Sequence, residues 1–577
     1  MIPFSVLVST FQRLEETSER LKMFEILANL FQQSSVEEID KIVYFCQGEL
    51  LPSFHGVEMG MSDKYLIRAI AKGSGALPEQ VSVAYQERGD IGSVAERFFG
   101  SPETESEISV VGVYEAVYQI AMLVGEGSVE KKMDALARLF SSVSGMEAKY
   151  IARFVVGKLR LGVGNATLLE ALAASKGERK CRVALNRGYH VTSDLGEVAK
   201  TFYQFGIEGI RQLSVKVGSP IQPALCERLS SAEEIIRKIG RCSVEMKYDG
   251  LRCQVHKNGS NVILFSRSME RTTPMFPEIV EAIQMFLPND TLIIEGEVLA
   301  FDEASGTLLP FQTTMQRKRK HGIGEKARAY PLKLYAFDLL YHNGVDYTER
   351  GYRERRGQLE RLVPKNPVIE LSQVVETEDS HVVAHVFEAA VEQGLEGIIA
   401  KRLDAPYALG SRNFNWIKLK RSYKGALSDS LDLVIVGYNR GHGQRARWGM
   451  GTVLAAVYDS VTDRYQTVSK VGTGFSEEAL CALKILLDDH LVSEKPKEVD
   501  SLMVPDQWVC PKYVISVLAD EITRSPNHTA GRGEDGMGYA LRFPRVQGFV
   551  REDKKARDVT DTSEIIAMFN KQKRVAI

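Results

Sequence analysis

Cysteine is scarce in this sequence. Its seven cysteines are scattered over 577 residues, with no CxxC pair and no histidine at ligand spacing nearby. This distribution argues against a structural zinc site and against a disulfide framework. We therefore expect a protein of a reducing, intracellular environment. The cysteines are Cys46, Cys181, Cys226, Cys242, Cys253, Cys481 and Cys510.

The sequence also lacks a long apolar run and an excess of charge of either sign. The opening MIPFSVLVSTFQRLEE has no basic leader, and no later run approaches the roughly 20 apolar residues of a membrane span. We expect a chain that is neither exported nor inserted in a membrane. Because the formal net charge is −2, an anion-binding surface must come from local clusters of Lys and Arg.

A Walker-type phosphate loop, GxxxxGK[ST], does not occur in the sequence, which argues against a P-loop ATPase or kinase. GRGEDG at 531–536 satisfies GxGxxG, but it lies in a polar loop between expected strands and not at a strand-to-helix turn. Any use of a nucleotide must therefore depend on other residues.

The chain changes in character twice, which predicts a multidomain protein. Apolar residues recur at helical spacing through the first two hundred residues, and Gly and Pro interrupt the pattern in VKVGSPIQPAL at 215–225. Alternating runs with helical stretches between them follow. After Lys424 one clear helix, SEEALCALKILLDDHL, accompanies five strand-like runs, which are LDLVIVGYN, GTVLAAVYDS, RYQTVSKVG, KYVISVLADEI and YALRFPRV. We predict an all-α bundle at 1–217, an α+β domain at 218–421, and an OB-fold β-barrel with a C-terminal tail at 422–577.

Two stretches of the helical region carry further signals. LKMFEILANLFQQ at 21–33 predicts a helix with one apolar face. GKLRLGVGNATLLEAL at 157–172 sets Lys158 and Arg160 among glycines ahead of a helix, which suits a phosphate, although a solvated corner between helices is equally consistent. The expected apolar face of the first helix consists of Leu21, Phe24, Leu27, Ala28 and Phe31.

Three runs of the central region place polar side chains on one face of a strand. Side chains two residues apart on a strand project together, so Val244 and Met246 can enter a core opposite a polar face. Each run alone is consistent with the wet face of an amphipathic strand, but together they predict a shared cleft. The residues that share a face are Glu245 with Lys247, Glu295 with Glu297, and Trp416 with Lys418 and Lys420.

A lysine among cations and carboxylates suits covalent phosphoryl chemistry, in which the neutral amine attacks phosphorus. At pH 7.5 only about one lysine in a thousand is neutral, and lowering its pKa by roughly three units is worth about 4 kcal/mol. Lys418, Lys420 and a bound metal near Lys247 would supply that shift and would neutralise a triphosphate. The carboxylates would then hold the metal.

Six motifs follow one another through this region: KYDGLR from Lys247, FSRS around Arg267, IEGEVLAFD around Glu297, LYAFDLLYHNG around Phe337, LEGIIAKRLDAPYALGSR around Glu396, and WIKLK. In order and spacing they resemble the nucleotidyltransferase motifs of ATP-dependent DNA ligases. The bundle with LRLGVG and TSDLGEVA, and the barrel runs ending in YALRFPRVQGFVREDK, are similar to the flanking domains of the archaeal and eukaryotic replicative type. The resemblance spans almost the whole chain and is far more specific than KxDG alone.

The resemblance implies a role for each matching position. Lys247 would be the catalytic nucleophile that takes AMP from ATP, and Glu297 and Glu396 would hold Mg²⁺. Phe337 could instead be a core aromatic, Arg267 and Arg412 surface ion-pair partners, and Glu396 a cap. The implied nucleotide contacts are Glu245 at the adenine amino group, Phe337 on the base, Arg252 and Arg267 at ribose or phosphate, Glu297 at ribose or metal, and Arg412, Lys418 and Lys420 at the phosphates.

The implied activity is the sealing of nicks in duplex DNA, in replication, repair and recombination. ATP would donate AMP, Mg²⁺ would be the metal, and the chain would act as a cytoplasmic, nucleoid-associated monomer, with a sliding clamp as a partner by family alone. Gln222 departs from the family pattern, which has a cation there. The candidates for gripping DNA phosphates are Arg160, Lys424, Arg440, Arg445, Arg447 and RKRKH at 317–321, although for RKRKH we favour a solvated loop. A further set matches the barrel segment that swings over the nucleotide in the family, and it consists of Arg542, Arg545, Arg551, Asp553 and Lys554.

Three other classes of protein are weighed against this hypothesis. An RNA ligase or a capping enzyme shares the lysine chemistry but does not need a helical bundle of two hundred residues in front, and capping would depend on GTP. An NAD-dependent ligase would carry a cysteine zinc cluster and helix-hairpin-helix repeats after the barrel. A non-catalytic scaffold that binds nicks would tolerate the loss of Lys247.

Overall fold

The computed structural model describes the chain except for residues 18, 101–107, 178, 303–306, 310, 318–326, 421–429, 442–447, 552–553 and 575–577. Lys424, Arg445, Arg447, Asp553 and residues 318–321 of the basic run therefore lie outside the described residues. Among the helices that are described, none is both long enough and apolar enough to cross a membrane. The chain forms two compact units, Met1–Arg228 with Ile235–Ser380 and Ile399–Lys418, and Leu229–Glu234 with His381–Ile398 and Leu419–Ile577.

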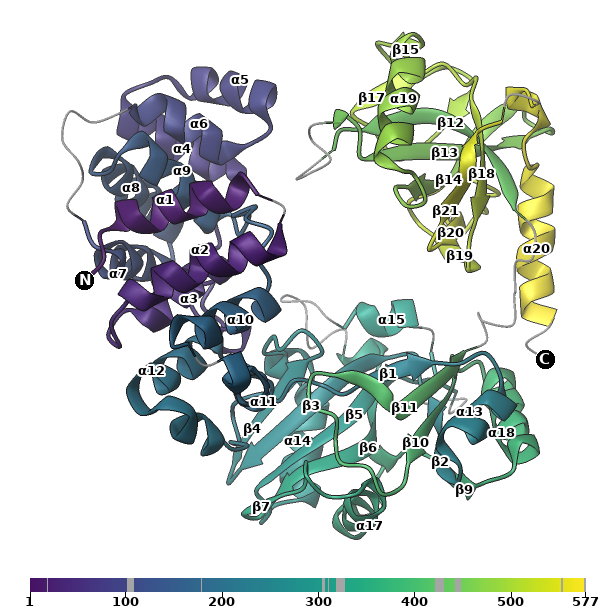
Figure 1. Cartoon of the computed structure of the whole chain (residues 1–577). Coiled ribbons are helices and arrows are strands. Elements are labelled where there is room, and N and C mark those ends of the chain that lie inside the picture. The colour runs from purple at the N-terminus through teal and green to yellow at the C-terminus, as the bar shows by residue number, and fades with distance from the viewer. Residues whose placement is uncertain are drawn as a thin grey trace. The chain divides into compact units, whose positions relative to one another are not determined.

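The N-terminal region, purple and blue in Figure 1, is built from helices, as predicted. Their apolar faces share one core. The helices are α1 Phe4–Glu15, α2 Arg20–Gln33, α3 Ile39–Gln47, η1 Ser53–His55, α4 Asp63–Ser74, α5 Pro78–Arg88, α6 Ile91–Phe99, α7 Val110–Ala121, α8 Ser128–Ser141, α9 Gly145–Val155, α10 Asn165–Ser175, η2 Arg179–Cys181, α11 Arg182–Thr192 and α12 Leu195–Arg211.

The predicted face of α2 is rotated from the observed one. Leu27 and Phe31 are fully buried as expected, but Leu21 is exposed and Phe24 is only half-buried. Met23 and Leu30 take the inward positions instead. The error arises because this helix buries a wide apolar stripe, so spacing alone leaves its centre undetermined.

Helix α12 begins in TSDLGEVA, as its capping residues predict. The side chain of Asp194 accepts a hydrogen bond from the backbone N–H of Glu197 at 2.9 Å and another from the hydroxyl of Tyr44 at 2.8 Å. Gly196 lies against the ring of Tyr44, where a Cβ would come within 2.2 Å of the ring carbon Cζ. This glycine therefore permits close packing of α12 on α3.

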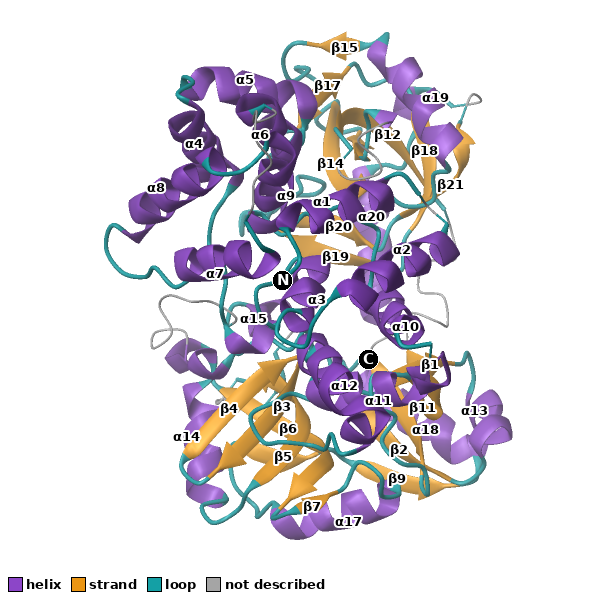
Figure 2. Ribbon diagram, turned by 60° about the vertical axis from the view of Figure 1, so that its left-hand side comes forward, coloured by secondary structure: helices purple, strands orange, loops and turns teal. Residues whose placement is uncertain are grey.

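Two sheets make up the central region (Figure 2), which confirms the predicted α+β class. Helix α14 packs on the second sheet through Ile279 and Ile283, which share a core with Val255 and Ile294. The first sheet has the order β1 Leu225–Arg228, β11 Arg412–Lys420, β10 Gly397–Arg402, β2 Cys242–Lys247, β9 Val374–Thr377. The second has the order β4 Asn261–Ser266, β3 Leu251–Asn258, β5 Leu292–Ala300, β6 Leu332–His342, β7 Val345–Asp346, with β8 Ile369–Leu371 parallel to β6. The helices are α13 Ala232–Ile239, η3 Thr273–Met275, α14 Pro277–Phe286, α15 Phe311–Met315, α17 Tyr352–Leu362 and α18 Ser380–Glu392.

The two sheets face one another across a small apolar cluster. It joins Ile293 and Leu340 of the second sheet to Trp416 of the first. The other members of the cluster are Val191, Val215, Ile221, Ala224 and Tyr407. Phe337, Cys226 and Ile399 pack against the cluster while remaining partly accessible. The strands that carry the predicted polar faces, β2 and β11 in the first sheet and β5 in the second, thus belong to two sheets that share this cluster.

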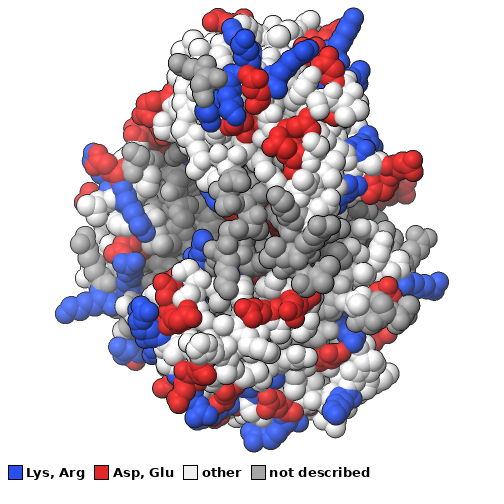
Figure 3. Space-filling model, turned by 90° about the vertical axis from the view of Figure 1, so that its right-hand side faces the viewer, with Lys and Arg blue, Asp and Glu red and all other residues white. Residues whose placement is uncertain are grey.

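The C-terminal region is a β-rich, OB-like domain with α19 Glu477–Asp488 at the predicted position. Over the face of the whole molecule that Figure 3 draws, charged side chains of both signs are interspersed, in keeping with a net charge of −2.

The other elements of the C-terminal region are β12 Leu431–Asn439, β13 Thr452–Asp459, β14 Arg464–Val471, β15 Leu491–Val492, β16 Val499–Asp500, β17 Gln507–Val509, β18 Val514–Leu518, β19 Glu521–Ser525, β20 Gly538–Arg542, β21 Arg545–Val550, η6 Ala556–Asp558 and α20 Thr562–Arg574.

Two of the five strands predicted in this domain are each divided in the structure. KYVISVLADEI forms β18 and β19, which separate at Ala519 and Asp520. YALRFPRV forms β20 and β21, with Phe543 at φ 52° and Pro544 between them. A left-handed residue followed by proline ends a strand, and the segments on either side pair with different neighbours.

We expect Gly196→Ala to lower the free energy of unfolding by about 1–3 kcal/mol, because its methyl group displaces the buried ring of Tyr44. Thermal unfolding measures the change. Gly357→Ala is the control, because a Cβ at this glycine in α17 meets nothing within 4 Å and alanine favours the helix. A melting temperature that falls no further in the first variant than in the second contradicts the prediction.

Candidate active site

Lys247 is the last residue of β2, and a tight turn follows it. Gly250 packs so closely on β5 that a Cβ would lie 2.4 Å from the carbonyl oxygen of Val298. Tyr248 is buried with its ring stacked on Tyr335, the centroids 4.4 Å apart, and burial raises the pKa of Tyr248 to about 12. The turn is thus held by both residues, and half-buried Lys247 is fixed at the strand end.

The predicted alternation along β2 is only partly right. Val244 is buried and Lys247 half-buried as expected, but Met246 is only half-buried and Glu245 is just 2% exposed. The second face of the strand is covered because α17 and the loop after β8 supply side chains that bond to Glu245. Glu245 therefore lies beneath the cleft surface and not on an open wall.

Glu245 accepts from three donors. The ammonium nitrogen of Lys401 lies 2.8 Å from Oε1, and the hydroxyl of Tyr352 donates to the same oxygen. The hydroxyl of Ser372 donates to Oε2 at 3.4 Å. Burial, and next the charge of Glu245, raise the pKa of Tyr352 well above its ordinary value, so this hydroxyl keeps its proton.

Lys401 is a site residue that the sequence analysis missed. Its ammonium nitrogen lies 4.2 Å from the ring centroid of Trp416 and 4.9 Å from that of Phe337, and it donates to the carbonyl of Phe337 at 3.2 Å. The available signal was a single lysine in the apolar run GIIAKR, because a fully buried lysine needs a partner. Phe337 is half-buried beside this cation, so it is not a fully enclosed core aromatic.

Arg252 is held in a buried polar cluster between the two sheets. Its guanidinium donates to Glu295 at 2.8 Å, to the hydroxyl of Tyr407 at 3.1 Å and to the carbonyl of Ala224 at 2.8 Å. Tyr407, which was also missed, donates to Glu295 at 2.6 Å. Burial alone would lower the pKa of Arg252, but the charge of Glu295, the hydrogen bond to Glu295 and smaller contributions together raise it.

The thiol of Cys226 on β1 is within the electrostatic influence of four cations. Burial raises the pKa of that thiol, while the positive charges of Arg252, Lys247, Lys401 and Lys418 oppose the rise. Lys247 and Lys418, both predicted site residues, thus act on the same thiol as Arg252 and Lys401. Such a concentration of positive charge suits a polyphosphate.

The remaining predicted residues lie in more varied surroundings. Arg267, in the turn after β4, and Arg412, at the start of β11, are exposed. Lys420 forms an ion pair with Glu396 at 2.9 Å. Glu297 is half-buried on β5, directly opposite Arg252 of β3.

The carboxylates of the predicted site are too few to enclose a metal ion without other ligands. Within the described ranges, no group of three or more His, Cys, Asp or Glu side chains could hold a metal. Mg²⁺ commonly binds one or two carboxylates and takes its other ligands from water and substrate phosphates. The carboxylates present thus fit a magnesium ion that arrives with a nucleotide.

The linker ahead of the first sheet is fastened to the helical region. The backbone N–H of Gln222 donates to the carbonyl of His190 at 2.8 Å, and its side-chain amide donates to Ser193 at 3.0 Å. The side chain of Gln222 thus binds Ser193, at a position where we expect relatives to carry a cation.

Of the cations proposed to grip DNA, the structure describes Arg160, Arg317 and Arg440, and the first two are paired. Arg160 has φ 63°, donates to the carbonyl of Gly89 at 3.2 Å and lies 3.7 Å from Asp90. Arg317 is 2% exposed and lies 2.8 Å from Glu278, so the expectation of a solvated loop is wrong for this residue. The run RKRKH does not predict the burial of Arg317, because its partner Glu278 is distant in the sequence. Arg440 is exposed at the end of β12.

The barrel segment expected to swing over the nucleotide is bonded within its own domain. Lys554 lies 2.6 Å from Asp432, and Arg551 lies 3.4 Å from the same carboxylate. Arg545 pairs with Asp520 at 2.7 Å. Burial would raise the pKa of Asp432, but the bonds from Lys554 and Ser516 lower it.

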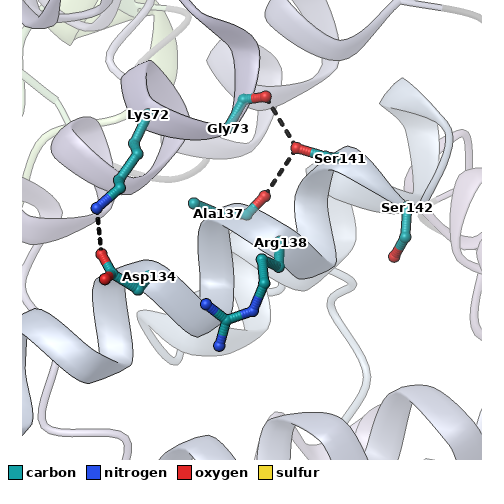
Figure 4. Close-up of a pocket in the computed structure, with 7 residues that line it drawn as sticks. All are labelled: Lys72, Gly73, Asp134, Ala137, Arg138, Ser141 and Ser142. Atoms are coloured by element: carbon teal, nitrogen blue, oxygen red, sulfur yellow. Dashed lines mark hydrogen bonds and ion pairs between the residues drawn. The ribbon is translucent and has the colours of Figure 1, made fainter.

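A separate pocket of about 370 Å³ opens between α4 and α8 (Figure 4). Lys72 pairs there with Asp134 at 2.5 Å, and Ser141 donates to the carbonyls of Gly73 and Ala137. These polar groups satisfy one another, and none is a predicted site residue. The predicted site residues lie instead in the central region.

The fold and the site define a class, the covalent nucleotidyltransferases that act through lysine. Residues 223–420 match the family described as "ATP dependent DNA ligase domain", 3–173 "DNA ligase N terminus", and 446–554 "ATP dependent DNA ligase C terminal region". The chain is 47% identical to "Probable DNA ligase" of Dictyoglomus thermophilum over 99% of this chain and 98% of that one. It is 40% identical to "DNA ligase 2" of Thermofilum pendens, over 100% of this chain and 98% of that one.

Solved structures agree with the fold. The structure titled "Pmar-Lig_PreS3" superposes with a TM-score of 0.55 at 18% identity, covering 94% of this chain and 99% of that chain. The chain belongs to the ATP-dependent DNA ligase family, whose members seal nicked duplex DNA in three transfers with ATP as AMP donor and Mg²⁺.

We expect Arg252→Met to destabilise the protein by about 3 kcal/mol, because it leaves Glu295 buried without its cation. Denaturant unfolding measures the change. The double variant Arg252→Met with Glu295→Gln should recover part of the loss. Losses in the two single variants that add in the double variant would show that the pair is not coupled.

Proposed function

We propose that Lys247 is the nucleophile of this ligase. The observation that carries the assignment is its position: a rigid turn fixes the amine at the end of β2, and the cations Arg252, Lys401 and Lys418 lie near the same thiol as Lys247 does. Neighbouring positive charge favours the neutral amine that attack requires, and it also attracts a triphosphate.

The proposed reaction has three transfers. The lone pair of the lysine nitrogen attacks the α-phosphorus of ATP, an N–P bond forms, pyrophosphate leaves and the amine proton passes to solvent. The 5′-phosphate of a nick then attacks the same phosphorus and breaks the N–P bond. Finally the 3′-hydroxyl attacks the activated 5′-phosphorus and expels AMP. In-line positioning and electrostatic stabilisation by fixed side chains supply most of the rate.

The nucleotide contacts follow from where each side chain lies. The ammonium group of Lys401 contacts both the carboxylate of Glu245 and the ring of Phe337. Lys401 can therefore hold both groups in position against a purine. The set we assign to the nucleotide is Glu245 at the adenine amino group, Phe337 on the base, Arg252 and Arg267 at ribose or phosphate, Glu297 at ribose or metal, and Arg412, Lys418 and Lys420 at the phosphates.

Glu297 and Glu396 are the candidate ligands for Mg²⁺. Lys420 lies 2.9 Å from Glu396 and competes with any metal for that carboxylate, so we expect Glu297 to contribute more. When bound, Mg²⁺ neutralises charge on the phosphates.

For the whole protein we propose a nucleoid-associated, cytoplasmic monomer that grips nicked duplex mainly through backbone phosphates, without reading sequence. The exposed cations Arg160 and Arg440 are candidates for this grip. Replication, repair and recombination, and through them cell division, are the processes that supply such nicks. A sliding clamp as a recruiting partner is proposed from the family alone.

ATP labelled at the α-phosphate tests the proposal directly. The label should remain on the denatured protein, be lost on addition of nicked duplex, and be absent in Lys247→Ala, whose amine is gone. Lys257→Ala is a control, because that buried lysine donates to three backbone carbonyls outside the cleft. Labelling from NAD or GTP but not from ATP, or undiminished sealing by Lys247→Ala, would refute it.

We propose that Arg551 and Lys554 leave Asp432 to contact the nucleotide in the first transfer only. Changing both to Met should slow adenylation of Lys247 by about tenfold or more, because two cations are lost from the pyrophosphate. Sealing of a nick that already carries AMP should change little. The two rates, measured separately, decide the point, and equal losses in both would contradict the assignment.

A further inference from the structure

The donors that hold Glu245 come from three separate elements. Lys401 belongs to β10 and Ser372 to the loop after β8, while Tyr352 is the first residue of α17. Tyr352 is 2% exposed, and its hydroxyl meets the same oxygen, Oε1, as the ammonium group of Lys401.

The number of acceptor positions on Glu245 limits what else can bind there. A carboxylate offers about four such positions, two on each oxygen. Oε1 accepts from Tyr352 and Lys401, and Oε2 accepts from Ser372. The described partners therefore leave one position on Oε2, and it can take only a hydrogen-bond donor.

Helix α17 holds Tyr352 firmly in place. Arg355, 0% exposed, donates to both oxygens of Asp338 at 2.7 and 3.0 Å. Arg356 donates to the hydroxyl and carbonyl of Ser372 at 2.9 and 2.8 Å. The helix that carries the tyrosine thus also orients the serine on the opposite oxygen, so both sides of the carboxylate are fixed by one element.

We propose that Tyr352 is a positioning residue that sets the selectivity of this enzyme for a 6-aminopurine nucleotide. By fixing Oε1 it turns the open position of Oε2 toward the amino group of the base. A 6-oxo group would place a second acceptor against the carboxylate, and a purine without a 6-substituent would leave that position empty. The inference rests on the proposed function, in which Glu245 meets the adenine amino group.

A substitution of Lys401 would test the orientation of Glu245 less cleanly than a substitution of Tyr352. Its ammonium group also contacts the rings of Phe337 and Trp416, so removing it would disturb the whole base site and leave Glu245 buried without a countercharge. Tyr352→Phe removes only a hydroxyl and keeps the ring. It therefore isolates orientation of the carboxylate from its charge.

The experiment compares α-labelled ATP with α-labelled purine riboside triphosphate, which lacks the 6-amino group, as donors of label to the full chain. We expect Tyr352→Phe to lower the preference for ATP by about tenfold, the equivalent of one hydrogen bond to a charged group. The rate at saturating ATP should change by less than about threefold, because the reacting atoms are untouched. A purely structural defect would slow both donors equally.

Tyr347→Phe is the matched control. This half-buried tyrosine of the same domain packs on the core of the second sheet, away from Glu245, and its variant should keep the wild-type preference. An unchanged preference in Tyr352→Phe overturns the positioning role while the ligase function stands. A wild-type protein that takes no label from ATP overturns the proposed function itself.

A second variant decides the matter if Tyr352→Phe does not fold. Ser372→Ala removes the donor to Oε2 and should lower the preference for ATP by about threefold, less than the tyrosine because its bond is longer. A folded Ser372→Ala protein with the wild-type preference would then refute the proposal.

Discussion

The buried ion pair between Glu245 and Lys401 is the interaction on which the site depends. Lys401 is fully buried and Glu245 nearly so, and neither charge could remain in the interior alone. Each partner also has further bonds, to Tyr352 and Ser372 on one side and to the carbonyl of Phe337 on the other. A buried charged pair with these further bonds is rigid, and rigidity suits the proposed recognition of a base.

A second buried pair, Arg252 with Glu295, serves the neighbouring part of the cleft. It ties β3 and β5 to Tyr407 and, through the carbonyl of Ala224, to the chain segment that enters the first sheet. Both pairs are desolvated, so their fields act on the cleft with less screening than surface charges would. These pairs thus hold the cations Arg252 and Lys401 in fixed positions.

The barrel and the helical region show a different use of charge. Arg551 and Lys554 share Asp432, and Arg160 is partnered by Asp90 and a backbone carbonyl. Such pairs are partly exposed and cost little to exchange for a phosphate. The pairs of the central region are therefore buried, whereas the cations proposed to move onto phosphates, in the barrel and in the helical region, are held in partly exposed pairs.

The sequence alone determined the class of each domain, the order of the motifs and the position of Lys247, because helical spacing, strand alternation and the KYDG turn are local properties. Only the tertiary structure decided that Glu245 is enclosed, that Lys401, Tyr352 and Tyr407 belong to the site, and that Arg317 is buried. These facts depend on which distant segment covers a strand face, and alternation along one strand cannot show that. The division of YALRFPRV into two strands was likewise set by long-range pairing around Phe543 and Pro544.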